Sequence, residues 1–226
     1  MANAPTLIGV SGLAGSGKDT LCGMLVELGY TQVAFADPLK RIVQGLYGFS
    51  EETLWGASEL RNTTLPEYLD PTGNPMSARH CLQLIGTEGV RASCPDTWVI
   101  LGLKSSKAIL EGARYTRTKG VFDVGVAPAP RGVCLSDVRF KNEVEAIRAA
   151  GGKLIRIVRP QCKAAPDNWL RRAIQRLTQI VRPAHRSERE LSDMPDSCFD
   201  FVIHNEGTLE DLRQIVVSIE KKLCTI

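Results

Sequence analysis

The feature that most constrains this chain is a glycine-rich loop, Gly-Leu-Ala-Gly-Ser-Gly-Lys, over residues 12–18. It follows the apolar run Thr6–Val10, whose β-branched residues predict a buried strand. Apolar residues then recur at helical spacing from Lys18 to Leu28, and Gly29 is expected to end that helix. A strand, a glycine-rich loop and a helix in this order indicate a phosphate-binding loop, in which backbone N–H groups, the helix N-terminus and the lysine bind phosphate oxygens.

The rest of the chain alternates between strand-like apolar runs and helical patterns, which is typical of a parallel sheet covered by helices. Further strands are expected at Thr31–Phe35, Val133–Val138, Lys153–Val158 and Phe199–His204, and helices at 38–46, 76–90, 97–111, 141–150 and 208–223. A length of 226 residues suits one domain with a core of normal size. We therefore expect an α/β fold in a single domain over residues 1–226, a P-loop NTPase-type parallel sheet flanked by helices.

The sequence also predicts the extent of the sheet core, two helix caps and one long loop. The sheet core is expected at about residues 1–50, 131–160 and 197–226. Asp96 is predicted to cap the helix that begins at Thr97, and Thr208 to cap the last helix, with Asp211 in its first turn. Residues 112–131 are rich in Gly, Pro and basic residues without a period, which predicts a long, mobile loop.

Composition excludes several classes of protein. A net charge of +3 argues against a strongly basic nucleic-acid coat, so nucleic acid is an unlikely partner. No run approaches 18 apolar residues and the first residues lack the pattern of a signal peptide, so no membrane association is expected. Seven scattered cysteines without a Cys-x-x-Cys pair fit a reducing cytoplasm better than a zinc site or a disulfide framework.

The residues after the loop lysine depart from the commonest form of the motif. Ser or Thr usually follows the lysine and binds Mg²⁺, whereas this chain has Asp19 and then Thr20. We expect Lys18 to contact the β- and γ-phosphates of a nucleotide, and Asp19 and Thr20 to be candidate Mg²⁺ ligands, directly or through water. The nucleoside monophosphate kinases resemble the chain here, because they also place Thr second after the lysine.

Further blocks follow the loop in order. They are F-A-D-P-L-K at 35–40, R-H-x-x-Q-x-x-G-T-E at 79–88, S-D-V-R-F-K-N-E at 136–143, H-R-S-E at 185–188 and I-H-N-x-G-T at 203–208. Over nearly the whole chain, this order and spacing resemble the bacteriophage-type deoxynucleoside monophosphate kinases, a P-loop kinase family. Where that family commonly shows a second bulky residue after Thr-Glu, this chain has Gly89.

The resemblance implies ATP-dependent phosphorylation of a deoxynucleoside 5′-monophosphate, with ATP and Mg²⁺ as cofactors and nucleotides as small-molecule partners. It implies ATP-binding residues at Gly12, Gly15, Ser16, Gly17, Lys18, Asp19, Thr20, Arg182 and Asn205. It implies acceptor-binding residues, in and around a helical region over about 51–112, at Lys40, Arg79, Gln83, Gly86, Thr87, Trp98, Asp137, Arg139 and Glu143. Lys18, Asp137, Arg139 and Arg186 would be the catalytic residues. Many members dimerise, which leaves a homodimer open, and the expected location is the cytoplasm, or the host cytoplasm for a phage-encoded chain.

Residue spacing supports part of this assignment. Gln83 lies one helical turn after Arg79, and Thr87 one turn further, so the three can share a helix face. Asp137 and Arg139 are two residues apart at the carboxyl end of a strand, where α/β sheets bind ligands.

Structural interpretations of the same residues remain open. Arg79 could be a solvated helix residue, Trp98 could be ordinary core, and Glu143 could be a first-turn helix carboxylate.

The segment 159–189 has a local excess of six positive charges, and the resemblance implies an Arg-rich lid over about 159–190. Arg182, Arg186 and Arg189 are its candidates for closing over ATP. A solvated basic helix or a nucleic-acid patch is the alternative.

Two other functions are consistent with the sequence. One is a P-loop kinase for another phosphorylated metabolite, such as dephospho-coenzyme A or phosphomevalonate. The other is a non-catalytic protein that binds nucleotide or nucleic acid through the basic segment; it predicts salt-dependent DNA binding.

Overall fold

The computed structural model describes residues 6–13, 15–125, 127–160, 190 and 193–223. Its centre is a five-stranded sheet in the order β2-β7-β1-β8-β9, and every neighbouring pair is parallel. The strands are β1 (Thr6–Ser11), β2 (Tyr30–Val33), β7 (Gly132–Val138), β8 (Lys153–Val158) and β9 (Phe201–His204). The expected α/β fold with a parallel sheet is confirmed, and every predicted strand of the sheet is present.

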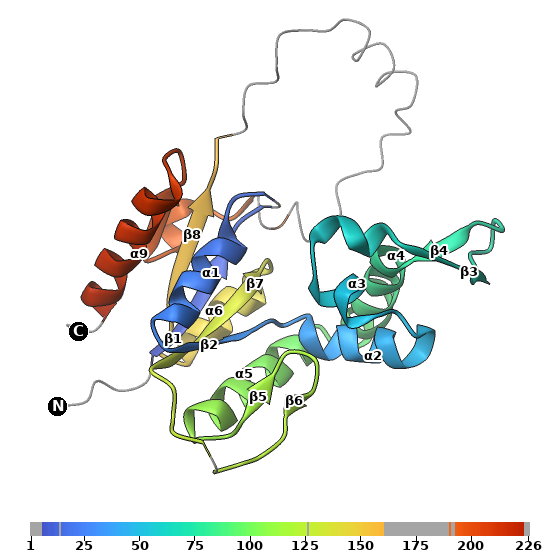
Figure 1. Ribbon diagram of the computed structural model, residues 1–226, viewed down its shortest axis with the longest axis horizontal. Helices are drawn as coiled ribbons and strands as arrows, with labels where there is room; N and C mark the ends of the chain where they lie inside the picture. The colour runs from blue at the N-terminus through green and yellow to red at the C-terminus, as the bar shows by residue number, and fades with distance from the viewer. Residues whose placement is uncertain (1–5, 14, 126, 161–189, 191–192, 224–226) are drawn as a thin grey trace, which may run out of the picture.

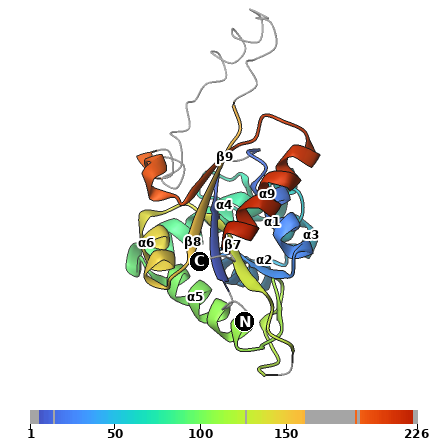
Figure 2. The ribbon, with the colours of Figure 1, turned by 90° about the vertical axis from the view of Figure 1, so that its left-hand side faces the viewer.

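Helices cover both faces of this sheet (Figures 1 and 2). One face is covered by α1 (Lys18–Glu27) and α9 (Leu209–Leu223), and the other by α5 (Thr97–Leu110) and α6 (Lys141–Ala149). Side chains alternate between these two layers: Val133 and Leu135 pack on the α6 side, whereas Cys134 between them packs on the α1 side. Alternation on a strand buried from both sides explains why β7 reads as a continuous apolar run.

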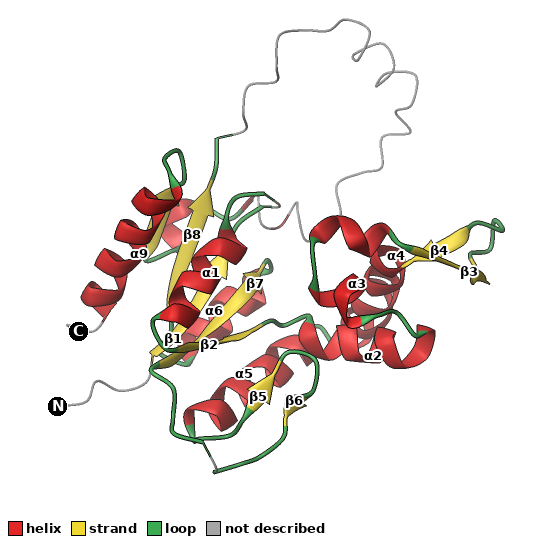
Figure 3. Cartoon of the chain, in the orientation of Figure 1, coloured by secondary structure: helices red, strands yellow, loops and turns green. Residues whose placement is uncertain are grey.

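A mostly helical unit connects β2 to α5 and projects from one side of the sheet (Figure 3). Its elements are α2 (Asp37–Tyr47), α3 (Glu51–Trp55), a 3₁₀ turn (Ser58–Asn62), the hairpin strands β3 (Thr64–Leu69) and β4 (Pro75–Ser77), α4 (Ala78–Gln83) and a π-helix (Leu84–Arg91). The unit thus lies beside the carboxyl end of β2, where ligands of parallel sheets bind.

The single helix expected over 76–90 is wrong in two respects. Met76 belongs to the β3–β4 hairpin, whose turn forms because the Asp70 carboxylate accepts bonds from Thr72 N and Asn74 N and Gly73 has a φ of 85°. After α4 the helix widens into a π-helix, a conformation that is rare and often found at functional sites. The apolar periodicity of the sequence distinguishes neither the hairpin strand nor the π-helix from an ordinary α-helix.

Two further expectations about connections need correction. Residues 112–131 are not only loop: they contain the short hairpin β5 (Tyr115–Thr116) and β6 (Gly120–Val121). Asp96 occupies the N-cap position of α5 but makes no capping bond, because its Oδ1 accepts from Asn142 Nδ2 at 2.8 Å instead. The cap of the last helix is confirmed, since Asp211 N donates to Thr208 Oγ1 and Thr208 N to the Asp211 carboxylate.

In the part of the chain that the structure describes, none of the helices is both long enough and apolar enough to cross a bilayer.

Candidate active site

The glycine-rich loop lies between β1 and α1, as the sequence predicts. Ser16 is buried, and its Oγ has no hydrogen-bond partner within the described residues. A Cβ added at Gly12 would lie 2.5 Å from Ser16 Oγ and 2.7 Å from the Ile157 carbonyl oxygen, so only glycine fits there. Asn205, at the end of β9, donates from Nδ2 to the Ser16 carbonyl at 2.9 Å. The loop is thus held from β8 and β9 and keeps a buried donor available to an anion.

Asp137, near the carboxyl end of β7, binds the segment that follows β2. Its two carboxylate oxygens accept from Phe35 N at 2.7 Å and from Ala36 N at 3.0 Å. The strands β7 and β1 are neighbours in the sheet, so Asp137 lies beside the loop that follows β1. Its placement confirms that the carboxyl ends of these strands meet at one site.

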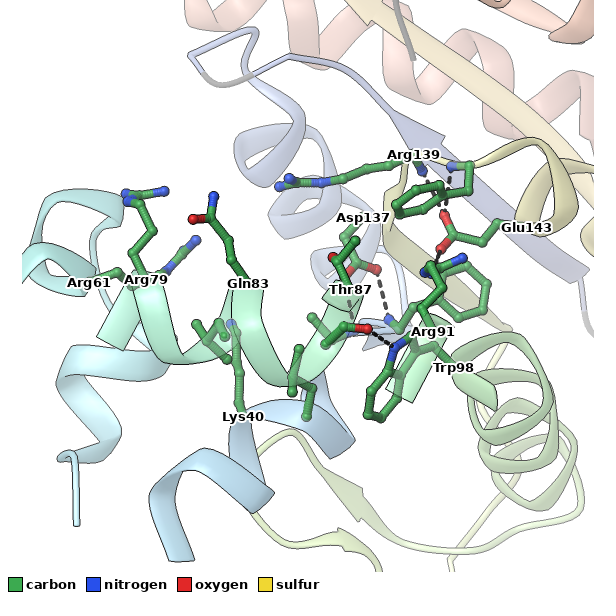
Figure 4. Close-up of a pocket in the computed structure, with 16 residues that line it drawn as sticks. Lys40, Arg61, Arg79, Gln83, Thr87, Arg91, Trp98, Asp137, Arg139 and Glu143 are labelled. Atoms are coloured by element: carbon green, nitrogen blue, oxygen red, sulfur yellow. Dashed lines mark hydrogen bonds and ion pairs between the residues drawn. The ribbon is translucent and has the colours of Figure 1, made fainter. Parts of the chain in front are cut away.

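A first cavity, of about 180 Å³, lies between the helical unit and the carboxyl end of β7, and we call it the inner cavity (Figure 4). Its lining includes all nine residues expected to bind an acceptor: Lys40, Arg79, Gln83, Gly86, Thr87, Trp98, Asp137, Arg139 and Glu143. Figure 4 shows Arg79, Gln83 and Thr87 on successive turns of one helical face, extending toward Arg139 and Asp137. The π-helix carries Thr87, and therefore sets where that hydroxyl lies in the cavity.

Trp98 and Glu143 are both buried parts of this cavity rather than exposed contacts. Trp98 is 4% exposed, and its Nε1 donates to the Gly86 carbonyl at 3.0 Å. Glu143 accepts from Arg139 N, from Phe140 N and from Arg91, whose NH2 lies 2.8 Å from Oε1. Both residues therefore line the cavity and also have a structural role, because each one forms a hydrogen bond that fixes the backbone of the cavity wall.

The ion pair between Arg91 and Glu143 joins the end of the π-helix to the start of α6. Both side chains are buried, and the Arg91 guanidinium also stacks 3.7 Å from the centroid of the Phe140 ring. Burial raises the pKa of Glu143 to about 7, with the charge of Asp137 adding to the effect and Arg91 and two backbone N–H groups opposing it. This pair is a positioning element for the wall of the inner cavity.

A second cavity, of about 170 Å³, lies between the glycine-rich loop and the inner cavity, and we call it the outer cavity. It is lined by Gly12, Gly15, Lys18 and Asp19 from the loop region, and it shares Ala36, Lys40, Arg61, Arg79, Asp137 and Arg139 with the inner cavity. The two cavities are therefore parts of one continuous site, and the residues they share mark its middle.

Cations dominate this middle region. The outer cavity is lined by Lys18, Lys40, Arg61, Arg79, Arg117 and Arg139, and its acidic lining residues are Asp19 and Asp137. Burial, helped by the charges of Arg117 and Arg61, lowers the pKa of Lys40 to about 8. Burial and the nearby charges of Arg79 and Arg139 lower the pKa of Arg61 as well. Like charges held this close favour a ligand with several negative charges.

Three arginines that line these cavities were not identified as site residues from the sequence. Arg61 lies in the 3₁₀ turn, Arg91 ends the π-helix and Arg117 lies between β5 and β6. Arg61 and Arg117 each stand in a segment whose sequence has no period, so nothing in the local pattern separated them from solvated arginines. Arg91 closely follows the Thr-Glu block, but the sequence could not show that its side chain forms a buried ion pair with Glu143.

Other predicted residues lie apart from the two cavities. Thr20 is exposed on α1 and lies outside both linings, as do Ser16, Gly17 and Asn205, which instead form the body of the loop and its support. Arg182, Arg186 and most of the expected lid lie outside the described residues.

Comparison with known proteins finds a relative that matches nearly the whole chain. A protein of Acanthamoeba polyphaga mimivirus named "Putative deoxynucleotide monophosphate kinase" is 30% identical to the chain over 213 residues, which cover 94% of each sequence. The chain belongs to this kinase family. No family model matches the chain.

Solved kinase structures give a weaker likeness to this kinase-family chain. Dephospho-CoA kinase from Campylobacter jejuni is 16% identical, with 99% and 100% of the two chains covered and a TM-score of 0.42. Shikimate kinase from Acinetobacter baumannii, in complex with shikimate, is 15% identical, with 97% and 95% covered and a TM-score of 0.44.

Proposed function

We propose that the protein transfers the γ-phosphoryl group of ATP to a deoxynucleoside 5′-monophosphate, giving ADP and the deoxynucleoside diphosphate. One observation carries this proposal: the cavity at the phosphate-binding loop and the cavity of the helical unit share Lys40, Arg61, Arg79, Asp137 and Arg139. A donor nucleotide on the loop and an acceptor in the inner cavity would bring their phosphates together among these cations. The family of the mimivirus relative supports the same reaction.

The reaction needs charge neutralisation and alignment more than it needs proton transfer. An oxygen of the acceptor phosphate forms a bond to the γ-phosphorus of ATP, and the bond from that phosphorus to the β,γ-bridging oxygen breaks. The electron pair stays on the oxygen of ADP, and no proton has to leave the acceptor, because its phosphate is already an anion near neutral pH. The cations in the middle of the site would hold the two anions against their mutual repulsion.

The loop residues fit a polyphosphate. Ser16 Oγ is a buried hydroxyl without a partner among the described residues, and Gly12 leaves backbone space that any Cβ would fill. Lys18 is the first residue of α1, so its ammonium group and the helix N-terminus act at the same place. These groups would bind the β- and γ-phosphates of ATP.

The acidic residues of the outer cavity fit Mg²⁺, a hard cation that prefers oxygen ligands. Asp19 is 81% exposed with an oxygen 3.7 Å from Lys18 Nζ, and Asp137 lines the same cavity. We propose that Asp19 and Asp137 hold the ion, directly or through water, and that Thr20 does not. When bound, Mg²⁺ would neutralise phosphate charge during transfer.

Substitution of Gly12 by alanine should weaken ATP binding selectively. The new Cβ would meet the Ile157 carbonyl oxygen and Ser16 Oγ, so the loop would have to shift away from its phosphate-binding geometry. We expect KM for ATP to rise by roughly tenfold or more, with KM for the acceptor changed far less. Gly23→Ala is a matched control, because a Cβ at Gly23 on α1 meets no neighbouring atom. Equal KM values for ATP in both variants would contradict this role of Gly12.

The inner cavity fits a nucleoside monophosphate with its phosphate toward the middle of the site. Arg79 is held by Asn62 Oδ1 and the Ser58 carbonyl oxygen, at 2.9 and 2.8 Å. Arg79 and Arg61 would bind the acceptor phosphate, since guanidinium groups match phosphate oxygens in a bidentate way. Gln83 and Thr87 then face the sugar or the base, and Trp98 closes the cavity behind them.

Lys40 gives the acceptor site a distinctive pH dependence. In the folded protein its pKa is about 8, below the ordinary value of 10.5, so Lys40 loses its charge as the pH rises through 8. The unfolded chain keeps that proton until about 10.5, so this group contributes more to stability as the pH rises from 8 toward 10.5. Phosphate binding prefers the charged form and should change in the opposite direction.

We therefore expect kcat/KM for the acceptor to fall as the pH rises above about 8 in the wild type. In Lys40→Arg, whose side chain stays charged, this fall in kcat/KM above pH 8 should be absent, even if the overall rate is lower. The measurement is a pH profile of initial rates at saturating ATP. If the same fall in kcat/KM above pH 8 persists in the variant, the titrating group is not Lys40.

An acceptor panel tests the proposed function. Purified protein with Mg-ATP is given dGMP, dTMP, dCMP, 5-substituted dCMP and dAMP, and acceptor-dependent ADP formation is measured. Dephospho-coenzyme A and phosphomevalonate serve as acceptors of other chemistry. Turnover of at least one deoxynucleotide supports the proposal. Turnover of none of them, or of dephospho-coenzyme A or phosphomevalonate alone, would reject it.

A further inference from the structure

Asp37, the first residue of α2, is a fully buried carboxylate outside the residues assigned so far. It accepts from Ala34 N at 2.9 Å, from Trp55 Nε1 at 2.9 Å and from the Tyr115 hydroxyl at 3.0 Å. Arg117 adds its Nε, 3.3 Å from both carboxylate oxygens. Four donors from three parts of the chain, two of them in the β5–β6 hairpin, thus converge on one buried charge, which fixes the position of each donor.

Arg117 is held at two points by the same helix. Besides the bond from its Nε to Asp37, its carbonyl oxygen accepts from Arg41 NH1 at 2.8 Å. Asp37 and Arg41 are four residues apart on α2, so they lie on one face of that helix. The β5–β6 hairpin, which is packed against this face, therefore presents Arg117 in a fixed position.

The side chain of Arg117 reaches the outer cavity. It lines that cavity together with Gly12, Lys18 and Asp19, and with the shared residues in the middle of the site. The bonds to Asp37 use Nε alone, so the two terminal nitrogens keep four N–H groups for an anion. An arginine whose Nε is fixed by a carboxylate has its terminal nitrogens already oriented, and loses little freedom on binding.

Electrostatics place this guanidinium near the other cations. Its charge contributes to the lowered pKa of Lys40 and of Arg61, in both cases after the effect of burial. The Asp37 carboxylate raises the pKa of Arg117 itself. The carboxylate therefore keeps one more cation close to a group of cations that would otherwise repel it.

We propose that Arg117 is a catalytic residue that contacts the phosphoryl group during its transfer, and that Asp37 and Arg41 are its positioning residues. This inference rests on the proposed phosphotransfer at the same site. Arg117 would stabilise the charge on the oxygens of the transferred group, as an arginine supplied from within the same chain. No bond to Arg117 forms or breaks, and no proton is transferred.

The competing explanation is that Arg117 only supplies the counter-charge for buried Asp37. The two explanations differ in what a substitution changes. A counter-charge role predicts lost stability and unchanged kcat per folded molecule. A catalytic role predicts a lower kcat in protein that is still folded.

The experiment compares Arg117→Ala with two control variants. Arg114→Ala removes an exposed arginine of the same segment, and Tyr115→Phe removes a neutral donor to Asp37 while leaving the Arg117 guanidinium. For Arg117→Ala we expect kcat to fall by at least about 100-fold, with KM for either nucleotide changed by less than about tenfold. Added guanidinium ion, below its denaturing range, should restore part of the rate in that variant alone. Both control variants should keep kcat within about threefold of the wild type.

A second measurement does not depend on the acceptor. Inorganic tripolyphosphate is titrated into wild type and Arg117→Ala by calorimetry, and binding should be at least about fivefold weaker in the variant. Wild type that turns over no acceptor rejects the proposed function, and the tripolyphosphate result still decides whether Arg117 contacts phosphate. Wild-type turnover together with unchanged kcat in Arg117→Ala rejects the catalytic role. The catalytic role is also rejected if the loss of rate is proportional to the loss of folded protein and added guanidinium ion does not restore it.

Discussion

Lys18→Ala should abolish phosphotransfer while leaving the protein folded. Lys18 is the first residue of α1 and lines the outer cavity beside Gly12, and its Nζ lies 3.7 Å from the Asp19 carboxylate. That ion pair is largely exposed on the Asp19 side, so it contributes little to stability. Negative charge develops between the donor and acceptor phosphates during transfer, and without the ammonium group of Lys18 no mobile cation neutralises it. We expect kcat to fall by about 10³-fold or more.

Rate and stability must be measured together for this variant. Coupled ADP-release assays give kcat, and thermal or denaturant unfolding should give a midpoint close to that of the wild type. Lys104→Ala, which removes an exposed lysine on α5, is the matched control and should leave both quantities unchanged. A Lys18→Ala variant that keeps more than a tenth of the wild-type kcat would show that the loop lysine is not the main cation of the reaction.

Arg91→Met should cause the largest loss of stability among the substitutions considered. It removes the charged partner of Glu143 in a pair where both side chains are buried, and the stacking of Arg91 on Phe140. Breaking a buried ion pair from one side leaves the other charge uncompensated, which costs about 3–5 kcal/mol of unfolding free energy. Acceptor binding should weaken as well, because the pair joins two walls of the inner cavity.

The pH dependence of this loss has a definite sign. The pKa of Glu143 is about 7 in the folded protein and 4.5 as an ordinary value, so the folded state binds more protons between these values. Its contribution to the free energy of unfolding therefore decreases as the pH rises through that window. Without Arg91 the folded pKa rises further, so the deficit of Arg91→Met relative to wild type should be larger at pH 8 than at pH 5.5.

A double variant separates the ion pair from simple packing. Arg91→Met combined with Glu143→Gln removes both charges, and should be more stable than Arg91→Met alone at pH 8. Urea unfolding at two pH values measures all three proteins. A deficit that is the same at both pH values, and that the second substitution does not reduce, would mean that packing on Phe140 accounts for the effect.

Much of the lining of the inner cavity could be predicted because its residues form short blocks with a fixed order. Each of the nine expected residues lines the inner cavity. Helical spacing was enough to place Arg79, Gln83 and Thr87 on one face, even though the helix changes from α to π between them. Spacing alone could not show that change, nor that Gly86 in the widened part lies so close to Leu39 that an added Cβ would clash with its Cδ2.

The cations in the middle of the site show where such reasoning ends. Arg61 comes from a 3₁₀ turn and Arg117 from the turn of a hairpin whose strands have two residues each, and neither segment is long enough to show periodicity. Arg117 is brought to the site by Asp37, which is 80 residues away in the chain. Contacts of this kind depend on the packing of the helical unit against the hairpin, and no local pattern encodes them.

The sequence by itself determined the strand–loop–helix unit at residues 6–28 and the parallel sheet around it. It did so because glycine spacing, apolar periodicity and β-branched runs act over short distances. Only the tertiary structure decided that Arg61 and Arg117 join Lys40, Arg79 and Arg139 at the middle of one site. The physical reason is that the packing of distant segments holds these cations together against their repulsion, and buried carboxylates such as Asp37 offset part of it; both exist only in the folded chain.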